Sequence, residues 1–516
     1  MKAPEKQLSS SAKNKAMASV LEPCIFEHSR PGVTTTFLFD TESSNEFNAT
    51  DFERIIPQEF RRETPPRLPE CAQLDVIRHF LRLSQLNHCI DKAFYPLGSC
   101  TMKYNPKLCD AVSALSGFSD LHPHTPDEDA QGALAVMAQL QQFLCDITGF
   151  DAVTLQPAAG AHGELLGMMM IKAYFQQAGQ YQRTEVIVPD AAHGTNPATA
   201  VMCGFSVKEI RSKENGLIDL DQLDKALSEK TAALMLTNPS TAGLFERDIL
   251  TVSERVHQAG GLMYYDGANL NAILGQVRPA DMGFDVMHIN THKTFATPHG
   301  GGGPGCGPVA VGKKLEPFLP VPRILFNEAT GLYYRQADGD ALKHSVGKMK
   351  AFFGNFDMHV RAYTYLMAYG WLGLKQVSTD AVLNANYIKE RLKESYAVAF
   401  DSLCKHEVVF NNSKQQAADK RLRTMAIVKR LMDYGFHPPT VYFPLIVPEA
   451  LMIEPTETES KATLDGFIEA MLAIAEECQT DPELVLNAPY STPVSKVDET
   501  LAARHPNLNF FSSPLP

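Results

Sequence analysis

Short apolar runs alternate with helical patterns of apolar residues through the middle of the chain. Apolar runs at residues 185–188, 232–236, 262–265 and 286–289 predict buried strands. Between the second and third runs, Ile249, Val252 and Val256 recur at helical spacing, and Gly260 with Gly261 ends the pattern. This alternation of strands and helices predicts an α/β fold, in which a parallel sheet carries helices on its faces.

Helical patterns also flank this region. One apolar stripe runs from Leu134 to Ile147 behind an acidic first turn, and a second run covers residues 165–174. Near the carboxyl end, Leu422 to Met432 form another stripe that stops before Gly435. The pattern therefore becomes more helical after about residue 330, which predicts a second domain.

The first 90 residues have a different character, because proline and charge clusters dominate and only residues 74–86 form an amphipathic run. Such a segment buries little apolar surface by itself, so we expect it to pack on a neighbour. We predict three parts: an arm over residues 1–90, a large domain over residues 91–330 and a smaller C-terminal domain over residues 331–516.

Composition narrows the class of protein. The chain has 516 residues with 47 basic and 59 acidic side chains, and its net charge of -12 disfavours binding to nucleic acid. No apolar run approaches the roughly 18 residues of a membrane helix, so we expect no membrane span. None of the 10 cysteines forms a CxxC pair, which indicates a reducing compartment, and we expect a cytoplasmic protein.

The candidate catalytic residues lie directly after the predicted strands, where ligands bind in open parallel sheets. Asp266 ends the strand at 262–265, and Lys293 follows the strand at 286–289. Taken alone, the aspartate is typical of an Asp-Gly turn and the lysine of a solvated surface. As a pair they match pyridoxal phosphate enzymes, in which lysine forms a Schiff base and aspartate keeps the pyridine nitrogen protonated.

Two histidines near this lysine raise the question of a metal site. His288 and His292 are four residues apart, but the segment lacks the glutamate of HExxH and reads as a strand followed by a loop. The two rings would then not share a face, so we predict no metal ligands here and expect His292 to order the surroundings of Lys293. The glycines at 300–303 predict a loop that closely approaches a ligand or another subunit.

A further group of small residues precedes the helix at 165–174. Gly160 and Ala161 lie where this helix should begin, so its free N–H groups could bind a phosphate. His162 could stack on a flat ring, although a structural role is the alternative. Polar residues also follow two predicted strands: His193 and Thr195 after residues 185–188, and Asn238 and Thr241 after residues 232–236.

These segments closely resemble the glycine cleavage system P-protein family, specifically the second, lysine-bearing subunit of its two-subunit form. The resemblance covers nearly the whole chain and rests on these runs: YPLGSCTMKYNPK from Tyr95, QPAAGAHGE from Gln156, HGTNPATA from His193, NPSTAGLFE from Asn238, YYDGANLNA from Tyr264, HKTFATPHGGGGPG from His292, GFHPPTVYFPL from Gly435, EPTETE from Glu454 and NAPYSTP from Asn487.

The resemblance implies fold type I of the pyridoxal 5'-phosphate enzymes, with a large, mostly parallel sheet domain and a smaller C-terminal α+β domain. It makes Lys293 the Schiff-base lysine and Asp266 the partner of the pyridine nitrogen. The other expected cofactor-binding residues are His162 on one ring face, Ala268 under the other, Gly160 and Ala161 at the phosphate, and Asn238 and His292. Ser99 and Lys103 are candidates for the mouth of the site.

The activity implied by the resemblance is glycine decarboxylation, with release of CO2 and transfer of the aminomethyl group to the lipoyl arm of H-protein. Because the chain is roughly half as long as single-chain P-proteins, the resemblance also implies a first subunit as partner, in a heterotetramer of two plus two. Another fold type I enzyme, an amino-acid decarboxylase or aminotransferase, is the alternative. An inert scaffold subunit is disfavoured because such a subunit should lack Lys293.

Overall fold

The computed structural model describes residues 22–33, 55–64, 66–300, 305–339 and 343–512. The chain divides into two compact units, Ile90–Pro489 and a smaller unit made of Met1–Cys89 with Tyr490–Pro516. No helix in these described ranges is both long and apolar enough to cross a bilayer.

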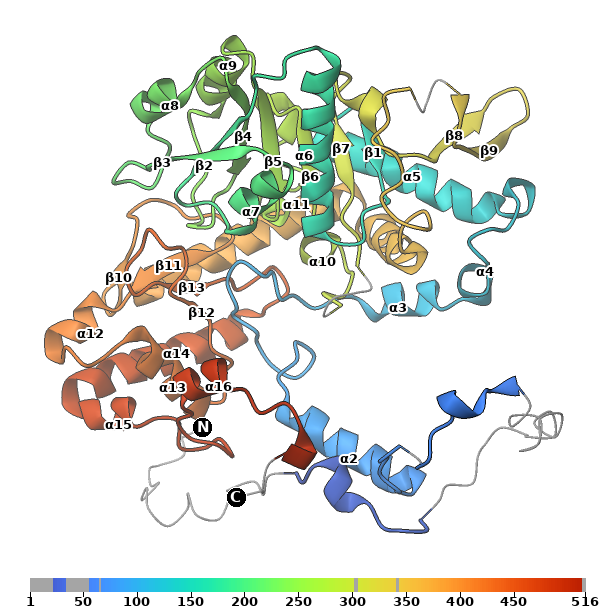
Figure 1. Cartoon of the computed structure of the whole chain (residues 1–516). Coiled ribbons are helices and arrows are strands. Elements are labelled where there is room, and N and C mark those ends of the chain that lie inside the picture. Colours follow the sequence, from blue (N-terminus) through green and yellow to red (C-terminus); the bar gives the residue numbers. More distant parts are fainter. Residues whose placement is uncertain (1–21, 34–54, 65, 301–304, 340–342, 513–516) are drawn as a thin grey trace. The chain divides into compact units, whose positions relative to one another are not determined.

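A seven-stranded sheet forms the centre of the larger unit, in the order β1-β7-β6-β5-β4-β2-β3 (Figure 1). Strand β7 is antiparallel to both of its neighbours, and every other neighbouring pair is parallel. All four predicted strands are confirmed. The strands are β1 (Ala152–Thr154), β2 (Glu185–Pro189), β3 (Ser206–Ile210), β4 (Thr231–Thr237), β5 (Leu262–Gly267), β6 (Val286–Ile289) and β7 (Val309–Val311).

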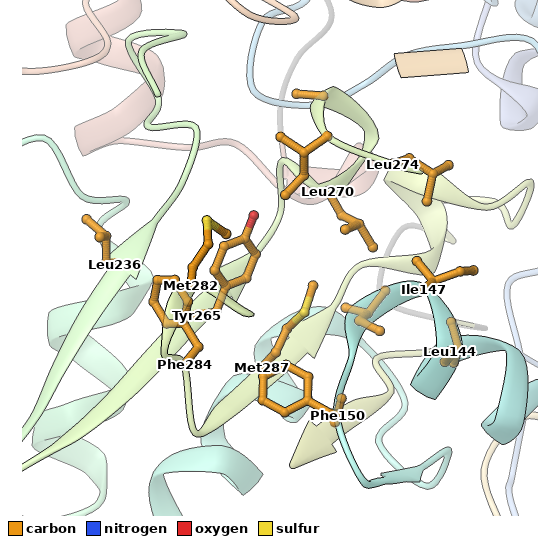
Figure 2. Packing of buried hydrophobic residues seen from close by; sticks show 14 of the residues in the cluster. Leu144, Ile147, Phe150, Leu236, Tyr265, Leu270, Leu274, Met282, Phe284 and Met287 are labelled. Atoms are coloured by element: carbon orange, nitrogen blue, oxygen red, sulfur yellow. The ribbon is translucent and has the colours of Figure 1, made fainter. Parts of the chain in front are cut away.

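Both faces of this sheet are buried, because successive residues along its strands alternate between two apolar clusters. On β5, Tyr265 belongs to one cluster and Tyr264 to the other, and on β6 the same holds for Met287 and Val286. Figure 2 shows the cluster on the Tyr265 side. The helices along the sheet region are α5 (Gln131–Thr148), α6 (Gly160–Gln177), α7 (Thr195–Met202), α8 (Leu220–Ala226) and α9 (Ile249–Gln258).

A second, antiparallel sheet follows the long helix α11 (Phe356–Leu392), which packs on α5 and also on α14. This sheet has the order β10-β11-β13-β12 and gives the carboxyl part of the unit its α+β character. The helical stripe predicted near residue 428 is confirmed as α13. The elements are β10 (Ala397–Val398), β11 (Val408–Asn411), α12 (Ser413–Ala418), α13 (Thr424–Asp433), β12 (Thr440–Val441), β13 (Leu451–Ile453), α14 (Lys461–Thr480) and α15 (Pro482–Leu486).

Several shorter elements complete this unit. They are α3 (Lys107–Ser113), α4 (Ser116–Ser119), η4 (Asp127–Asp129), η5 (Leu270–Ala272), η6 (Pro279–Met282), α10 (Thr291–Thr294), η7 (Glu316–Phe318) and the hairpin of β8 (Arg323–Asn327) with β9 (Leu332–Gln336).

The smaller unit joins the amino-terminal arm to the carboxyl-terminal segment. Phe26 stacks on Phe510 at 5.0 Å between ring centroids. The predicted amphipathic helix is confirmed as α2 (Gln73–Leu86), and five of its large apolar side chains are more than half exposed: Leu74, Ile77, Phe80, Leu81 and Leu86. The remaining elements are η1 (Ile25–His28), η3 (Gln58–Phe60), α16 (Glu499–Arg504) and η9 (Phe510–Ser512). The domain boundary near residue 330 stays a prediction.

The central strand β6 offers a test of this packing. Met287 is fully buried on β6, so Met287→Ala should lower the free energy of unfolding by about 2–5 kcal/mol through lost apolar contacts and the cavity left behind. Met202→Ala is the matched control, because Met202 is 73% exposed and its truncation should cost less than about 0.5 kcal/mol. Urea unfolding followed by circular dichroism measures both, and equal costs would contradict the packing described.

Candidate active site

Asp266 and Lys293 lie at the same edge of the large sheet. Asp266 is near the end of β5, and Lys293 lies in α10, the single turn that follows the neighbouring parallel strand β6. Parallel strands bring their carboxyl ends to one edge, and the positive charge of Lys293 helps to lower the pKa of Asp266. The structure therefore brings together the two residues that the sequence selected.

The carboxylate of Asp266 is fixed by three donors in a buried position. Its Oδ1 accepts from the Ala268 backbone N–H at 3.0 Å and lies 3.2 Å from His288 Nε2, while Oδ2 accepts from Asn196 Nδ2 at 3.1 Å. Burial raises the pKa of Asp266, but the charges of His288 and Lys293 outweigh that effect and hold the pKa below its usual range. Asp266 is therefore an ionised group in a dry site.

The partner of Asp266 on the next strand is His288, whose Cα lies opposite that of Asp266 in the β5–β6 register. Its Nδ1 lies 2.9 Å from the Tyr264 hydroxyl. Burial lowers the pKa of His288, but the Asp266 carboxylate outweighs burial and the net shift is upward. The pair is thus a buried imidazolium–carboxylate contact, and Gly267 permits it because a Cβ there would lie 1.9 Å from the His288 carbonyl oxygen.

Asn196 extends this contact toward α6. Its Nδ2 also donates to Glu164 Oε1 at 3.2 Å, and burial raises the pKa of Glu164. Sequence reasoning assigned no role to Glu164 or Asn196, and it considered His288 only as a metal ligand. His288 had a usable signal, because alignment of the two predicted strands places it opposite Asp266. Glu164 and Asn196 had none, because they belong to different helices.

The predicted phosphate turn lies at the amino terminus of α6. Gly160 begins this helix, and a Cβ there would lie 2.3 Å from Asn290 Nδ2, so glycine allows the helix to approach the segment that leads into Lys293. His162 Nδ1 accepts from the Ala158 N–H at 3.2 Å, and burial lowers the pKa of His162, which keeps its ring neutral. In the described part of the chain, the buried Asn290 Oδ1 has no hydrogen-bond partner.

The loop after β4 is held by its own polar groups. Asn238 Oδ1 accepts from the Glu246 N–H at 2.9 Å, its Nδ2 lies 3.7 Å from Met282 Sδ, and Thr241 Oγ1 donates to the Ala191 carbonyl at 2.6 Å. These contacts occupy the Asn238 amide, and cofactor binding by this residue stays a prediction. Thr237, whose Cα pairs with that of Asp266, has a buried Oγ1 with no partner among the described residues.

Burial and the positive charge of Lys293 both lower the pKa of three histidines, His193, His292 and His299. The His292 ring lies 4.7 Å from that of His299, and burial together with the charges of His299 and Lys293 lowers the pKa of His292 to about 3. His193 Nδ1 lies 2.9 Å from Thr195 Oγ1 in the loop after β2. The predicted close-approach loop falls on residues 301–303, which lie outside the described residues.

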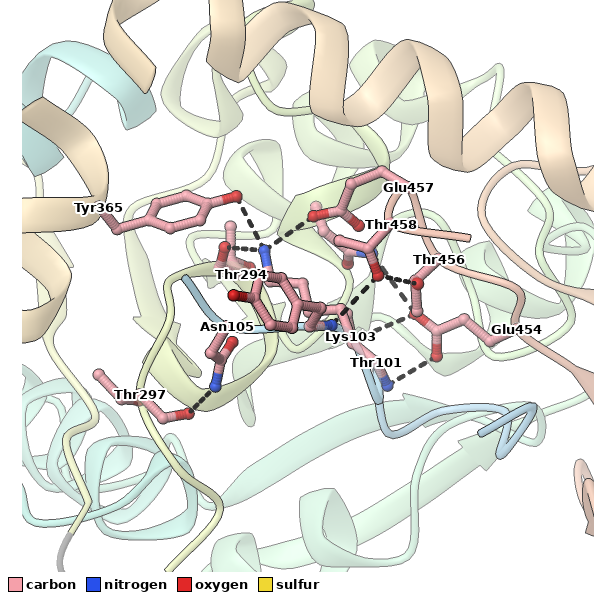
Figure 3. A network of polar contacts seen from close by, with 12 residues as sticks. Thr101, Lys103, Asn105, Thr294, Thr297, Tyr365, Glu454, Thr456, Glu457 and Thr458 are labelled. Carbon is pink, nitrogen blue, oxygen red and sulfur yellow. Dashed lines mark hydrogen bonds and ion pairs between the residues drawn. The ribbon is translucent and has the colours of Figure 1, made fainter. Parts of the chain in front are cut away.

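Lys103 anchors α10, the turn that carries Lys293. Its Nζ donates to the Thr294 carbonyl at 2.8 Å, to the Tyr365 hydroxyl at 2.9 Å and to Glu457 Oε1 at 2.9 Å (Figure 3). These three acceptors satisfy all three donors of the ammonium group. Burial lowers the pKa of Lys103, but Glu457 and Tyr365 outweigh it and raise the pKa overall. The prediction that Lys103 lies at the mouth is wrong, because its side chain is buried.

The fold and the strand-end pair define a class of protein, fold type I of the pyridoxal phosphate enzymes. Residues 167–320 match the family described as aminotransferase class-V. A crystal structure of glycine decarboxylase (P-protein) of the glycine cleavage system is similar with a TM-score of 0.67 at 20% identity, covering 84% of this chain and 97% of that chain. The structure of Oryza sativa TDC with PLP and tryptamine gives 0.60 at 13% identity, covering 81% and 90%.

Sequence relatives identify the family within this class. Residues 377–487 match the family described as glycine dehydrogenase, C-terminal domain. The probable glycine dehydrogenase (decarboxylating) subunit 2 of Kosmotoga olearia is 53% identical over 486 residues, which cover 94% of this chain and 99% of that relative. Its namesake in Caldanaerobacter subterraneus is 55% identical over 454 residues, covering 88% and 92%. The chain belongs to the glycine dehydrogenase (decarboxylating) subunit 2 family.

The buried ion pair of Lys103 with Glu457, which contacts α10, can be tested by removing one partner. Lys103→Met should lower the free energy of unfolding by about 3–5 kcal/mol, because the Glu457 carboxylate is left buried without its counter-charge. The double variant Lys103→Met with Glu457→Gln should cost clearly less than the single one.

Lys107→Met is the matched control for this experiment. Lys107 forms an exposed ion pair with Asp91, whose loss should cost at most about 1 kcal/mol. Urea unfolding gives all three values. If Lys103→Met costs no more than Lys107→Met, the buried contact does not hold α10 in place.

Proposed function

We propose that this protein binds pyridoxal 5'-phosphate at the carboxyl edge of its large sheet and decarboxylates glycine. The observation that carries the proposal is the juxtaposition of an ionised, buried Asp266 with Lys293 in a chain of the glycine dehydrogenase family. When bound, the cofactor supplies an electron sink for the pair of electrons left on carbon as CO2 departs. Membership of the family supports glycine as the substrate over other amino acids.

The residues at this edge fit such a cofactor. Lys293 would be the amine for the covalent link, and the ionised Asp266 would hold a proton on the pyridine nitrogen. The neutral ring of His162 suits stacking, Ala268 leaves room for the opposite face, and the α6 amides of Gly160 and Ala161 suit phosphate. Among the described residues, Asn290 Oδ1 and Thr237 Oγ1 have no hydrogen-bond partner, so they are available to a ligand at this edge. We propose Asn238 and His292 as further contacts.

Lys293 has a second task in this proposal. With the cofactor bound, the amine of Lys293 would be the group that holds or moves a proton beside the reacting carbon. His292 favours this role because its lowered pKa keeps its ring uncharged. The ring therefore adds no positive charge beside the lysine. Asp266 must keep its charge throughout, and the His288 and Asn196 contacts provide for that.

We further propose a heterotetramer of two copies of this chain with two copies of a first subunit. The relatives are named as subunits, and the exposed apolar side chains of α2 form a surface typical of protein interfaces. The aminomethyl group would pass to the lipoyl arm of H-protein. All ten cysteines are free thiols, which supports a reducing, cytoplasmic location.

An exchange assay tests this function directly. We expect the protein, its first subunit and lipoylated H-protein together to exchange labelled CO2 into glycine, while omission of H-protein abolishes the exchange. This chain without its first subunit should be a poor catalyst. Exchange that is independent of H-protein, with a free amine as product, would instead indicate the alternative of an ordinary amino-acid decarboxylase.

The variant Asp266→Asn tests the role of Asp266 in the same assay. A neutral amide cannot hold a proton on the pyridine nitrogen, so the exchange rate should fall by roughly 10²-fold or more, with the fold retained. Asp281→Asn is the matched control, because Asp281 pairs with Arg278 at the surface and should leave the rate unchanged. Near-normal exchange by the Asp266 variant at full cofactor occupancy would remove Asp266 from the mechanism.

A further inference from the structure

Two glutamates lie opposite each other at the adjoining ends of β11 and β13 in the second sheet. The β11–β13 register pairs Val408 with Ile453, and its continuation places Glu407 opposite Glu454. Both side chains are fully buried. Like charges that lie opposite each other on neighbouring strands repel, and a dry interior strengthens this repulsion. The pair therefore needs a compensating positive group.

Hydrogen bonds reach both carboxyl groups, but no lysine or arginine of the described residues forms an ion pair with either one. The Ser99 N–H donates to Glu407 Oε2 at 2.8 Å, and the Thr101 N–H donates to Glu454 Oε2 at 2.8 Å. Thr101 Oγ1 also donates to Glu454 Oε1 at 2.7 Å. Within the described chain, the ion-pair contact of Glu407 is with His406. Neutral donors weaken the repulsion between two buried carboxylates but do not balance their charge.

Three fully buried side chains at this place carry polar atoms that lack a hydrogen bond among the described residues. These atoms are Glu407 Oε1, both ring nitrogens of His406 and Asn271 Oδ1. Asn271 belongs to η5, and its Nδ2 lies 3.4 Å from Glu454 Oε1. Buried polar atoms are rarely left without partners, so several of them around one pair of carboxyl groups indicate a bound ion or ligand.

The spacing of these atoms suits the ligands of one metal ion. His406 Nε2 lies 3.5 Å from Glu407 Oε1, and one ligand atom from each of His406, Glu407 and Glu454 lies within 4.8 Å of the others. A separation of 3.5 Å is long for a hydrogen bond, whereas two ligands of a tetrahedral zinc ion lie about 3.3 Å apart. Zinc accepts imidazole and carboxylate ligands together, while magnesium and calcium take oxygen ligands.

We propose that His406, Glu407 and Glu454 bind one divalent metal ion, for which zinc is the best match, with Asn271 Oδ1 as the fourth ligand. The two positive charges of the ion balance the two carboxylates. The ion is structural, because its four ligand residues are fully buried. It joins β11 and β13 to η5, and so links the second sheet to the segment that follows β5.

Protonation of the carboxyl groups is the competing explanation. Burial raises the pKa of both groups and outweighs the charge of Lys293, which lowers it. A proton on Glu407 Oε1 would satisfy one nitrogen of His406 at most. A metal ion accounts for the unpartnered atoms of Glu407, His406 and Asn271 together, and therefore explains more of the structure.

The test measures zinc in the full chain without cofactor or substrate. The protein is loaded with Zn²⁺, freed of excess metal by gel filtration and analysed for zinc by mass spectrometry. We expect about one zinc ion per chain in the wild type and less than about one tenth of that in E407Q and in E454Q, because each variant removes a ligand and a charge. E449Q should keep the zinc, because Glu449 pairs with Arg423 instead. No zinc in the wild type, or undiminished zinc in either E407Q or E454Q, would overturn the proposal.

A second control separates this site from another group of the described residues. Glu22, His28 and His79 of the smaller unit also have ligand atoms at such a spacing, but Glu22 already pairs with Arg82. H28Q should therefore keep its zinc. Loss of the zinc in H28Q would place the ion in the smaller unit and refute the assignment.

X-ray absorption at the zinc edge identifies the ligands of the wild type and needs no variant. The ten free thiols are the competing ligands, and they bind zinc at about 2.3 Å. We expect nitrogen and oxygen neighbours at about 2.0–2.1 Å and the scattering pattern of a single imidazole. Sulfur neighbours, or two imidazoles, would contradict the proposal even if the glutamate variants do not fold.

Discussion

The structure depends on keeping one carboxylate ionised inside a dry sheet edge. Asp266 lies at the end of a fully buried strand, where an unpaired charge would cost several kcal/mol. His288 on the neighbouring strand supplies a positive charge, and the Ala268 amide and Asn196 supply hydrogen bonds. Both side chains among these groups are themselves held: His288 by Tyr264 and Asn196 by Glu164. The site is therefore a network whose members are needed together.

A second set of contacts holds the segments next to Lys293. Lys103 holds the turn that carries it, through the Thr294 carbonyl, and the loop around Cys100 lies against the segment that follows it, through His299 Nε2 at 3.0 Å. That same loop donates its amides to Glu407 and Glu454 of the second sheet. Residues from distant parts of the larger unit thus meet around the turn that carries Lys293.

The sequence predicted the parts of this site that depend on local pattern. Strands β5 and β6 could be recognised because short apolar runs end in polar residues, and Asp266 and Lys293 follow because strand ends in a parallel sheet converge. Lys103 was misplaced because sequence shows a charged residue in a polar segment and cannot show three acceptors from distant segments around it. Glu407 and Glu454 were missed because their meeting depends on the register of two strands more than 40 residues apart.

We propose that Lys293 is the amine that binds the cofactor. The most direct measurement is reduction of the cofactor-loaded protein with borohydride, followed by peptide mapping of the stable adduct. We expect an absorption band that borohydride abolishes and a pyridoxyl group on the peptide that contains Lys293. A pyridoxyl group on any other lysine, with Lys293 unmodified, would contradict this assignment.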